Sequence, residues 1–290
     1  MANNLKTVAL MALLGGLFVG LGYFFFGQQG ALIALGIAVV LNFFMYWFSD
    51  KIAIKAARAR PVAEHELPDV YAIVRSLAMR ADMPVPDIYL IHSDQPNAFA
   101  TGRNPKNAAV AVTTGIIEGL NYQELEGVLA HELSHVQNRD ILISSVAATI
   151  GVAMSFLARM AFWGSMGRRG GGNNAVTAVA GLAAIIIAPL IAVVIRMAIS
   201  RSREFEADRT GAELTGSPLN LASALDKLHA GTSRHPMEVG AAASTLFIAD
   251  PYASLSAQQR QKLRFSGMFS THPPIAERIE RLTQMSSPIS

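Results

Sequence analysis

Four long apolar stretches dominate the pattern of hydrophobic and polar positions along the chain. Residues 7–26 and 31–48 contain no charged side chain, and residues 141–163 and 175–199 contain one arginine each. A run of about 20 apolar residues is long enough to cross a hydrocarbon core roughly 30 Å thick. The pattern therefore predicts an integral membrane protein with up to four transmembrane helices, arranged as two helical hairpins.

The first pair of stretches is expected to be a retained hairpin rather than a cleaved signal peptide. The run of residues 7–26 is longer than the usual signal-peptide core of about 7–15 residues, and no small-residue cleavage pattern follows it. A tight turn is expected at residues 27–30. Gly16 and Gly20 form a G-x-x-x-G pair, which either permits close helix packing or reflects the ordinary glycine content of membrane helices.

Shorter patterns between and after the apolar stretches predict a mixed α and β domain. Residues 86–92 and 108–114 are rich in β-branched and aromatic residues and predict strands, whereas residues 97–105 are expected to be a turn-rich connection. Residues 231–255 show no clear period. Helical periods and start signals predict helices over residues 67–79, 202–214, 218–229 and 275–282.

A further helix is expected to begin after Asn121. Asn121 and Glu124 have the spacing of a capping box, in which each side chain bonds the other residue's backbone N–H. The helix carries both His131 and His135 and has a broad apolar face. That face consists of Leu125, Val128, Leu129, Leu133 and Val136.

The pentapeptide 131–135 of this helix, His-Glu-Leu-Ser-His, matches the pattern H-E-x-x-H. Two histidines four residues apart lie on one helical face and can both reach one zinc ion, while Glu132 can act as general base on a metal-bound water. His65 and Glu66 begin a similar pattern, but Asp69 stands where the second histidine is required. We therefore interpret only residues 131–135 as a metal motif.

A catalytic zinc site needs a third protein ligand and an open position for water. Glu204, Glu206 and Asp208 lie close together downstream. On a helix Glu204 and Asp208 share a face, so one can bind the metal while the other accepts the free ring N–H of a ligand histidine. Glu206 as ligand leaves that supporting role unfilled, and a solvated acidic face is the alternative to all three assignments.

Composition narrows the protein class. Hydrophobic residues make up 51% of the chain and charged residues 16%, against roughly 25% charged in ordinary globular domains. The absence of cysteine excludes disulfides and thiolate metal sites. The net charge of +3 gathers in basic clusters after the second and fourth apolar stretches, and nothing resembles a nucleic-acid-binding face. These clusters are Lys51, Lys55, Arg58 and Arg60, and Arg201, Arg203 and Arg209.

Basic clusters beside membrane spans favour the cytoplasmic side and suit anionic lipid head groups. They predict four parts: an N-terminal hairpin (1–48), the first cytoplasmic part of the domain (49–140), a second hairpin (141–199) and the second cytoplasmic part (200–290). Arg168 and Arg169, in the loop of the second hairpin, argue against this topology. That hairpin is therefore expected either to span the membrane or to lie shallow in it.

Taken together, these segments resemble the HtpX family of membrane-bound zinc metalloproteases. Residues 131–135, followed by Asn-Arg-Asp at 138–140, are similar to the family's zinc signature. Residues 202–208 resemble its second motif, in which the first glutamate of E-x-x-A-D binds zinc. Residues 97–102 and 271–274 are also similar to family segments, so the resemblance covers nearly the whole chain.

The resemblance implies a mainly helical membrane protein with a gluzincin-like α+β protease domain, in which a small β-sheet packs on the H-E-x-x-H helix. It assigns one zinc ion per chain to His131, His135 and Glu204, and the role of catalytic base to Glu132. It also implies that Asp208 supports a ligand histidine.

Two further expectations come from the same resemblance. His272 supports the transition state, or else is a structural histidine in a turn before two prolines. The strand at residues 108–114, or the neighbouring segment 97–102, pairs with an extended substrate through backbone hydrogen bonds. His92, His229 and His235 lack a partner pattern and are expected to have no role in the site.

The implied function is zinc-dependent endoproteolysis of misfolded or damaged membrane proteins at the cytoplasmic face of a bacterial inner membrane, as part of a stress response. The partners are then polypeptides and the lipid bilayer. A CAAX-type processing protease is an alternative, although those enzymes have more spans. A catalytically silent zinc-stabilised scaffold would have no use for Glu132. Transport is not favoured, because the apolar stretches carry only Arg159 and Arg196 and no charged relay.

Overall fold

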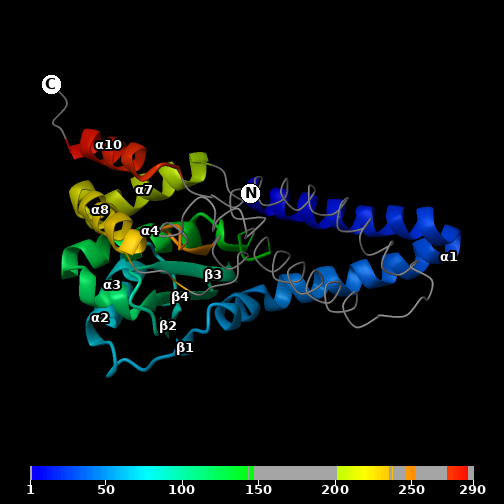
Figure 1. The fold of residues 1–290 in the computed structure, drawn as a ribbon, viewed down its shortest axis with the longest axis horizontal. Coiled ribbons are helices and arrows are strands. Elements are labelled where there is room, and N and C mark those ends of the chain that lie inside the picture. The colour runs from blue at the N-terminus through cyan, green and yellow to red at the C-terminus, as the bar shows by residue number, and fades with distance from the viewer. Residues whose placement is uncertain are drawn as a thin grey trace, which may run out of the picture.

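The computed structural model describes residues 2–142, 144–146, 201–234, 237, 246–251 and 273–286. In it, a long helical arm projects from a domain of helices and strands (Figure 1). The second predicted hairpin is outside the described residues, apart from its first few positions. His235 and His272 are also outside them.

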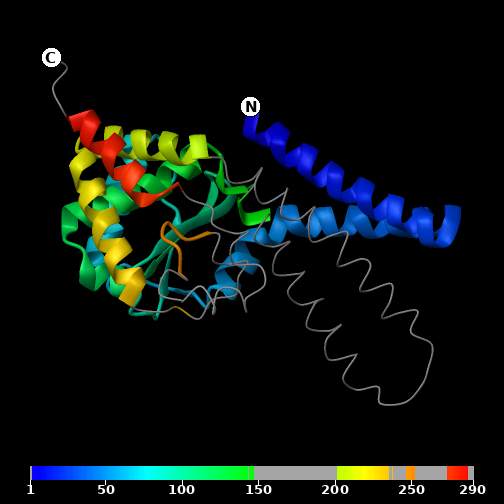
Figure 2. The ribbon, with the colours of Figure 1, turned by 45° about the horizontal axis from the view of Figure 1, so that its top comes forward.

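The arm is α1 (Ala2–Ala56), which reverses direction at Gly27. Gly27 has φ 64° and ψ −155°, a conformation that glycine adopts without a Cβ clash. The two halves of α1 run back alongside each other from this turn (Figures 1 and 2). The hairpin and its turn near residues 27–30 are thus seen as predicted.

Close packing within the hairpin occurs next to the turn rather than at the predicted glycine pair. A Cβ on Gly22 would lie 2.5 Å from the carbonyl oxygen of Gly30, so a side chain there would push the arms apart. A Cβ on Gly16 or Gly20 would meet no described atom within 4 Å, which fits ordinary glycine content. Farther from the turn, Asn42 Nδ2 donates to the Met11 carbonyl across the arms at 3.2 Å.

The second half of α1 has the properties of a membrane span. Gly27–Ala56 is 30 residues long and contains an 18-residue window of mean hydropathy 2.1, of which only 11% is buried. Within the described ranges it is the single helix that is long and apolar enough to cross a bilayer.

The domain contains a four-stranded sheet in the order β1-β2-β4-β3. The strands are β1 (Arg60–Pro61), β2 (Asp87–Ile91), β3 (Ala98–Asn104) and β4 (Asn107–Thr113). β2 and β4 are parallel, and the other two pairs are antiparallel. The strands predicted at 86–92 and 108–114 are confirmed.

The prediction of a turn-rich connection at residues 97–105 was wrong, because this segment forms β3. It contains only one β-branched residue, Thr101, and ends in turn-forming types. Pairing with β4 and burial of Phe99 outweigh that weak local preference. Since β4 lies between β2 and β3, residues 108–114 are not an edge, and of the two predicted segments only 97–102 can offer one to a substrate.

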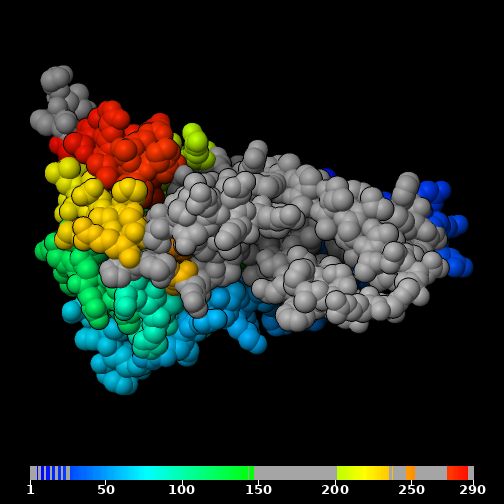
Figure 3. Space-filling model, viewed as in Figure 1, coloured from blue at the N-terminus to red at the C-terminus, as the bar shows by residue number. Residues whose placement is uncertain are grey.

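α4 (Tyr122–Gln137) lies on the sheet against β3, and other helices of the domain pack around it. The predicted helices are confirmed, although α8 (Pro218–Arg234) and α10 (Ile275–Ser286) both end later than expected, and a short unpredicted helix precedes α4. In Figure 3, α8 and α10 cover adjoining parts of the domain surface. The described helices are α2 (Pro68–Arg80), α3 (Thr114–Gly119), α4 (Tyr122–Gln137), α7 (Arg201–Thr215), α8 (Pro218–Arg234) and α10 (Ile275–Ser286).

The core forms where the apolar face of α4 meets the sheet and the helices around it. All five residues predicted for that face are buried in one hydrophobic cluster, together with Val110 and Val112 of β4 and Leu221 and Leu225 of α8. The small sheet is therefore packed on the helix that carries the H-E-x-x-H motif, as predicted.

Candidate metal centre

The start of α4 is fixed by the predicted capping box. Asn121 Oδ1 accepts the Glu124 N–H at 2.9 Å, and Glu124 Oε2 accepts the Asn121 N–H at 2.9 Å. Glu124 also accepts from Ser223 Oγ and Lys227 Nζ of α8, both at 2.7 Å. Burial alone would raise the Glu124 pKa, but these hydrogen bonds and the Lys227 charge outweigh burial and lower it. The helix that carries the metal motif is thus held at its first turn.

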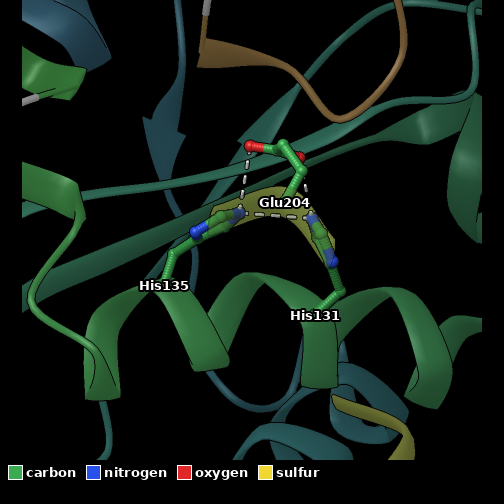
Figure 4. Close-up of side chains that lie close together, drawn as sticks. All are labelled: His131, His135 and Glu204. Carbon is green, nitrogen blue, oxygen red and sulfur yellow. Dashed lines mark hydrogen bonds and ion pairs between the residues drawn. The ribbon is translucent and has the colours of Figure 1, made fainter. Parts of the chain in front are cut away.

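Two turns farther along α4, the rings of His131 and His135 converge beneath Glu204 of α7 (Figure 4). The two Nε2 atoms are 3.3 Å apart. Glu204 Oε2 lies 3.7 Å from His131 Nε2, and Glu204 Oε1 lies 3.6 Å from His135 Nε2. Of the three carboxylates predicted as candidates, Glu204 is the one that lies beside the Nε2 atoms of both histidines.

The three donor groups fit a zinc ion. Their ligand atoms lie within 4.8 Å of one another. Zinc–nitrogen bonds of roughly 2.0–2.1 Å in a tetrahedron place neighbouring ligand atoms roughly 3.3–3.4 Å apart, close to the distances between these side chains. Two imidazoles and one carboxylate are also a common donor set of catalytic zinc sites, and they leave a fourth position open.

A glycine on α7 allows Glu204 to reach this position. A Cβ on Gly211 would lie 2.9 Å from the backbone nitrogen of His131 and 3.1 Å from its Cα. The backbones of α7 and α4 therefore touch at the metal motif, which any larger residue at 211 would prevent. This close crossing joins Gly211 to His131, two residues 80 positions apart in the chain.

Asp208 is one helical turn after Glu204 and lies on the other side of His131. Its Oδ1 is 2.9 Å from His131 Nδ1. If Nδ1 carries the ring proton and donates it to Asp208, the lone pair of Nε2 is left to face Glu204 and His135. This geometry agrees with the supporting role expected for Asp208.

Arg278 of α10 completes this group, and the sequence reasoning missed it. Its Nε donates to Asp208 Oδ2 at 2.9 Å and its Nη2 to Asp208 Oδ1 at 2.6 Å. Nη2 also lies 3.4 Å from both ring nitrogens of His131. Arg278 is fully buried, on the same helical face as Ile275 and Leu282. The sequence does contain a sign of this role, because Arg278 is a lone arginine on the apolar face of a predicted amphipathic helix.

Asp140 is a second residue whose role was missed. The chain turns back after α4 through Arg139, which has φ 59°, and the Asp140 N–H bonds the His135 carbonyl at 2.9 Å. This turn places Asp140 Oδ2 at 3.4 Å from His135 Nδ1. Each histidine of the motif thus has a carboxylate beside its Nδ1, Asp208 for His131 and Asp140 for His135.

Glu132 points from α4 toward the sheet. It is buried, and its Oε2 accepts the backbone N–H of Ala100 in β3 at 2.8 Å. The predicted base is therefore bonded directly to the edge strand. Outside the site, Glu206 pairs with Arg209 at 2.6 Å on the exposed side of α7, and Glu66 of the incomplete motif pairs with Arg60.

The model of peptidase family M48 matches residues 64–286 of the chain. The chain belongs to peptidase family M48. It is 48% identical to a "Protease HtpX homolog" of Thermodesulfovibrio yellowstonii over 286 residues, which cover 98% of this chain and 99% of that protein. It is 47% identical to a protein of the same description from Paraburkholderia phytofirmans, over 99% of this chain and 98% of that one.

A solved structure shares the fold at greater distance. The crystal structure of S. mikatae Ste24p matches 97% of this chain and 65% of its own length, with a TM-score of 0.50 and 18% sequence identity. This likeness concerns the fold alone. The family membership, the close relatives and the apolar α1 together identify the chain as a membrane metalloprotease.

In the absence of a metal, the two histidines of this M48 site differ in pKa and therefore in charge at neutral pH. Burial and the neighbouring Arg278 lower the His131 pKa to about 4, against the opposing pull of Asp208. For His135, burial also favours the neutral ring, but Glu204, Asp140 and Glu132 outweigh burial and raise its pKa to about 9. His131 is therefore neutral and ready to bind a metal, whereas a metal must displace a proton from His135.

Proposed function

We propose that this M48 chain is a zinc-dependent endopeptidase that cuts misfolded or damaged membrane proteins at the cytoplasmic face of a bacterial inner membrane. One observation carries the proposal: the ligand atoms of His131, His135 and Glu204 converge on one point, while the adjacent Glu132 is buried and bonds the edge strand β3. A scaffold site held by zinc would not need a buried carboxylate in that position.

The site residues have three separate roles: binding the metal, orienting its ligands and transferring a proton. His131, His135 and Glu204 hold one zinc ion, and Asp208 and Asp140 orient the two rings through Nδ1. Bound zinc supplies Lewis-acid chemistry, which makes a water molecule a better nucleophile and polarises a carbonyl. Glu132 accepts the proton of the attacking water at its carboxylate and passes it to the leaving amine nitrogen.

The substrate lies extended along the outer edge of β3. In an antiparallel pair, alternate residues of a strand bond the partner strand. The Asn97 carbonyl accepts the Thr113 N–H of β4, so residues 98, 100 and 102 direct their backbone N–H and C=O groups away from β4. Backbone pairing with such an edge gives affinity with little demand on sequence, which suits a protease of varied misfolded chains. His272 is proposed to support the transition state from the segment that leads into α10.

The cellular location rests on charge and on α1. Lys51 and Lys55 follow the apolar part of α1 and are exposed, which favours the cytoplasmic side for the domain. Arg201, Arg203 and Arg209 support the same side for the remainder of the domain, from residue 200 onward.

The test is hydrolysis of an unfolded polypeptide by the detergent-purified full chain. We expect cleavage that stops when a chelator removes the metal and returns when zinc is added back. The substitution Glu132→Gln should lower the rate by about 10²–10⁴-fold, the usual contribution of a general base. Cleavage that survives either treatment would refute the proposal.

A further inference from the structure

The membrane surface can be placed on α1 to within about one helical turn. Residues 31–48 are uncharged and, at about 1.5 Å per residue, nearly as long as a hydrocarbon core is thick. They end in an exposed aromatic group in which Phe43 is 56%, Phe44 51% and Trp47 42% exposed. Charge begins at Asp50 and Lys51. Aromatic belts of this kind mark the boundary between lipid and water, which puts the surface near Trp47.

The protease sheet is packed on α1 immediately beyond that boundary. Ala53 of α1 and Ala57, just after its end, are buried in one cluster with Ile91 of β2, Phe99 of β3 and Ala111 of β4. The span continues into this cluster as one helix, because α1 runs unbroken from Gly27 to Ala56. The sheet therefore sits at a fixed height above the membrane.

β3 connects this boundary to the catalytic site. Its Arg103 stacks on the ring of Trp47, with the guanidinium carbon 4.5 Å from the ring centroid. Three residues earlier, the Ala100 N–H bonds Glu132. At about 3.3 Å per residue, the strand from Arg103 to Ala100 spans about 10 Å, so the backbone N–H that bonds Glu132 lies no farther than that above the level of the Arg103 backbone.

The opposite end of the β3 edge is already occupied by the chain itself. The Ile248 N–H donates to the Ala98 carbonyl at 3.0 Å. The buried Asn97 side chain holds the same segment by donating to the Ala249 carbonyl at 2.8 Å and accepting its N–H at 3.2 Å. Toward the membrane the Gly102 N–H has a long 3.5 Å contact with Ser145 Oγ. Ser145 Oγ also lies 2.7 Å from Thr101 Oγ1, so a substrate that pairs with β3 must displace Ser145 on the membrane side or Ile248 on the other side. The backbone contact at Gly102 is the longer of the two, which favours displacement on the membrane side of Ala100.

We infer that the anchor and β3 together act as a ruler: the enzyme prefers polypeptides tethered to the same membrane, and it cuts them a few residues from the end of their span. This inference rests on the proposed endopeptidase function and specifies its substrate. An extended segment needs about three residues to climb the 10 Å from the boundary and at least one more to bring a peptide bond beside Glu132. Longer tethers still reach the site, at a cost that grows slowly with length.

The test uses model substrates in vesicles that also contain the full-length enzyme. Each substrate has one span, a Gly/Ser spacer of 1, 2, 6, 12 or 24 residues and the same cleavable segment; a soluble peptide with that segment is the matched control. We expect spacers of one or two residues to be cut at that segment at least tenfold more slowly than the spacer of six. Beyond six, each doubling should slow cleavage by about threefold or less.

The outcomes separate the ruler from the protease. Cleavage that depends on Glu132 but not on spacer length, or that is as fast for the soluble peptide, overturns the inference about the cut position. The proposed endopeptidase function is then unaffected. If no substrate is cut in a Glu132-dependent way, the proposed function fails and the ruler fails with it.

A second measurement tests the height without relying on activity. The chain has no cysteine, so Lys106→Cys, in the exposed turn after Arg103, gives a unique site for a depth-sensitive spin label. Met79→Cys in α2, on the far side of the domain from the arm in Figure 1, is the control. We expect the label at 106 to lie at head-group depth and the label at 79 to lie in bulk water. Equal depths would overturn the ruler.

Discussion

The pair formed by Asp208 and Arg278 gives the sharpest structural prediction. Both side chains are buried, and two hydrogen bonds of 2.9 and 2.6 Å join them. The substitution Arg278→Met keeps most of the volume but removes both bonds and the positive charge. Breaking a buried ion pair by removing one partner typically costs about 3–5 kcal/mol, because the remaining charge is left uncompensated.

Part of that cost should appear in zinc binding, since Asp208 orients His131. Losing a group that orients a metal ligand typically weakens binding 10–100-fold, or about 1.4–2.7 kcal/mol. The matched control is Arg281→Met, one turn along α10. Arg281 is 54% exposed, pairs with Glu277 at 3.0 Å and lies 3.6 Å from the Phe205 ring centroid. An exposed pair of this kind is worth at most about 1 kcal/mol.

The assay is competition with a chelating dye for zinc, on purified full-length protein whose helix content is unchanged. We expect Arg278→Met to bind zinc at least tenfold more weakly than Arg281→Met. Arg278→Lys keeps the positive charge but loses the planar geometry that makes two hydrogen bonds, so its zinc affinity should be intermediate. This variant keeps the prediction testable if Arg278→Met does not fold. Equal zinc affinity in the variants at 278 and 281 would refute this reasoning.

Four further predictions follow from other contacts. Because His135 has a raised pKa of about 9, apparent zinc affinity should increase about tenfold per pH unit from pH 7 and level off near 9; a flat profile in dye competition would contradict this. Gly211→Ala should weaken zinc binding at least tenfold by pushing α7 off α4, whereas Gly119→Ala, with open space around it, should not. Glu124→Gln should lower the unfolding free energy by about 1 kcal/mol at pH 7, since its partner Lys227 is half exposed. The folded-state pKa of Glu124 is lowered, so this stability is complete above the ordinary carboxyl pKa of about 4.3 and is lost as the pH falls through the lowered value; a difference from wild type that persists in acid would refute it. Asn97→Ala should speed amide exchange of residues 246–251 about 5–100-fold through loss of two buried hydrogen bonds, and unchanged exchange would show that those bonds do not hold the segment.

Local signals in the sequence were sufficient to predict the elements that carry the motif. The capping box at Asn121 and the apolar period of α4 both act within one helix, so their outcome did not depend on the rest of the fold. The relation between Glu204 and Asp208 could be read from helical spacing for the same reason.

Contacts between distant segments could not be predicted in this way. β3 forms because β4 lies beside it, and its own residues give little sign of a strand. The pairing of Asp208 with Arg278 joins α7 to α10 across 70 residues, and it depends on how those helices pack. Nothing near Gly211 in the sequence indicates that a glycine is needed there. The need arises only from the backbone of α4, which lies against Gly211 in the folded chain.

Glu204 and Glu132 are both buried carboxylates in one site, yet Glu204 is proposed to bind the metal and Glu132 to move protons. The most direct measurement determines zinc content and peptide hydrolysis together in Glu132→Gln and Glu204→Gln. We expect Glu132→Gln to keep about one zinc per chain and to lose nearly all hydrolysis, whereas Glu204→Gln should lose both. Hydrolysis at the wild-type rate in Glu132→Gln, or full zinc content in Glu204→Gln, would contradict it.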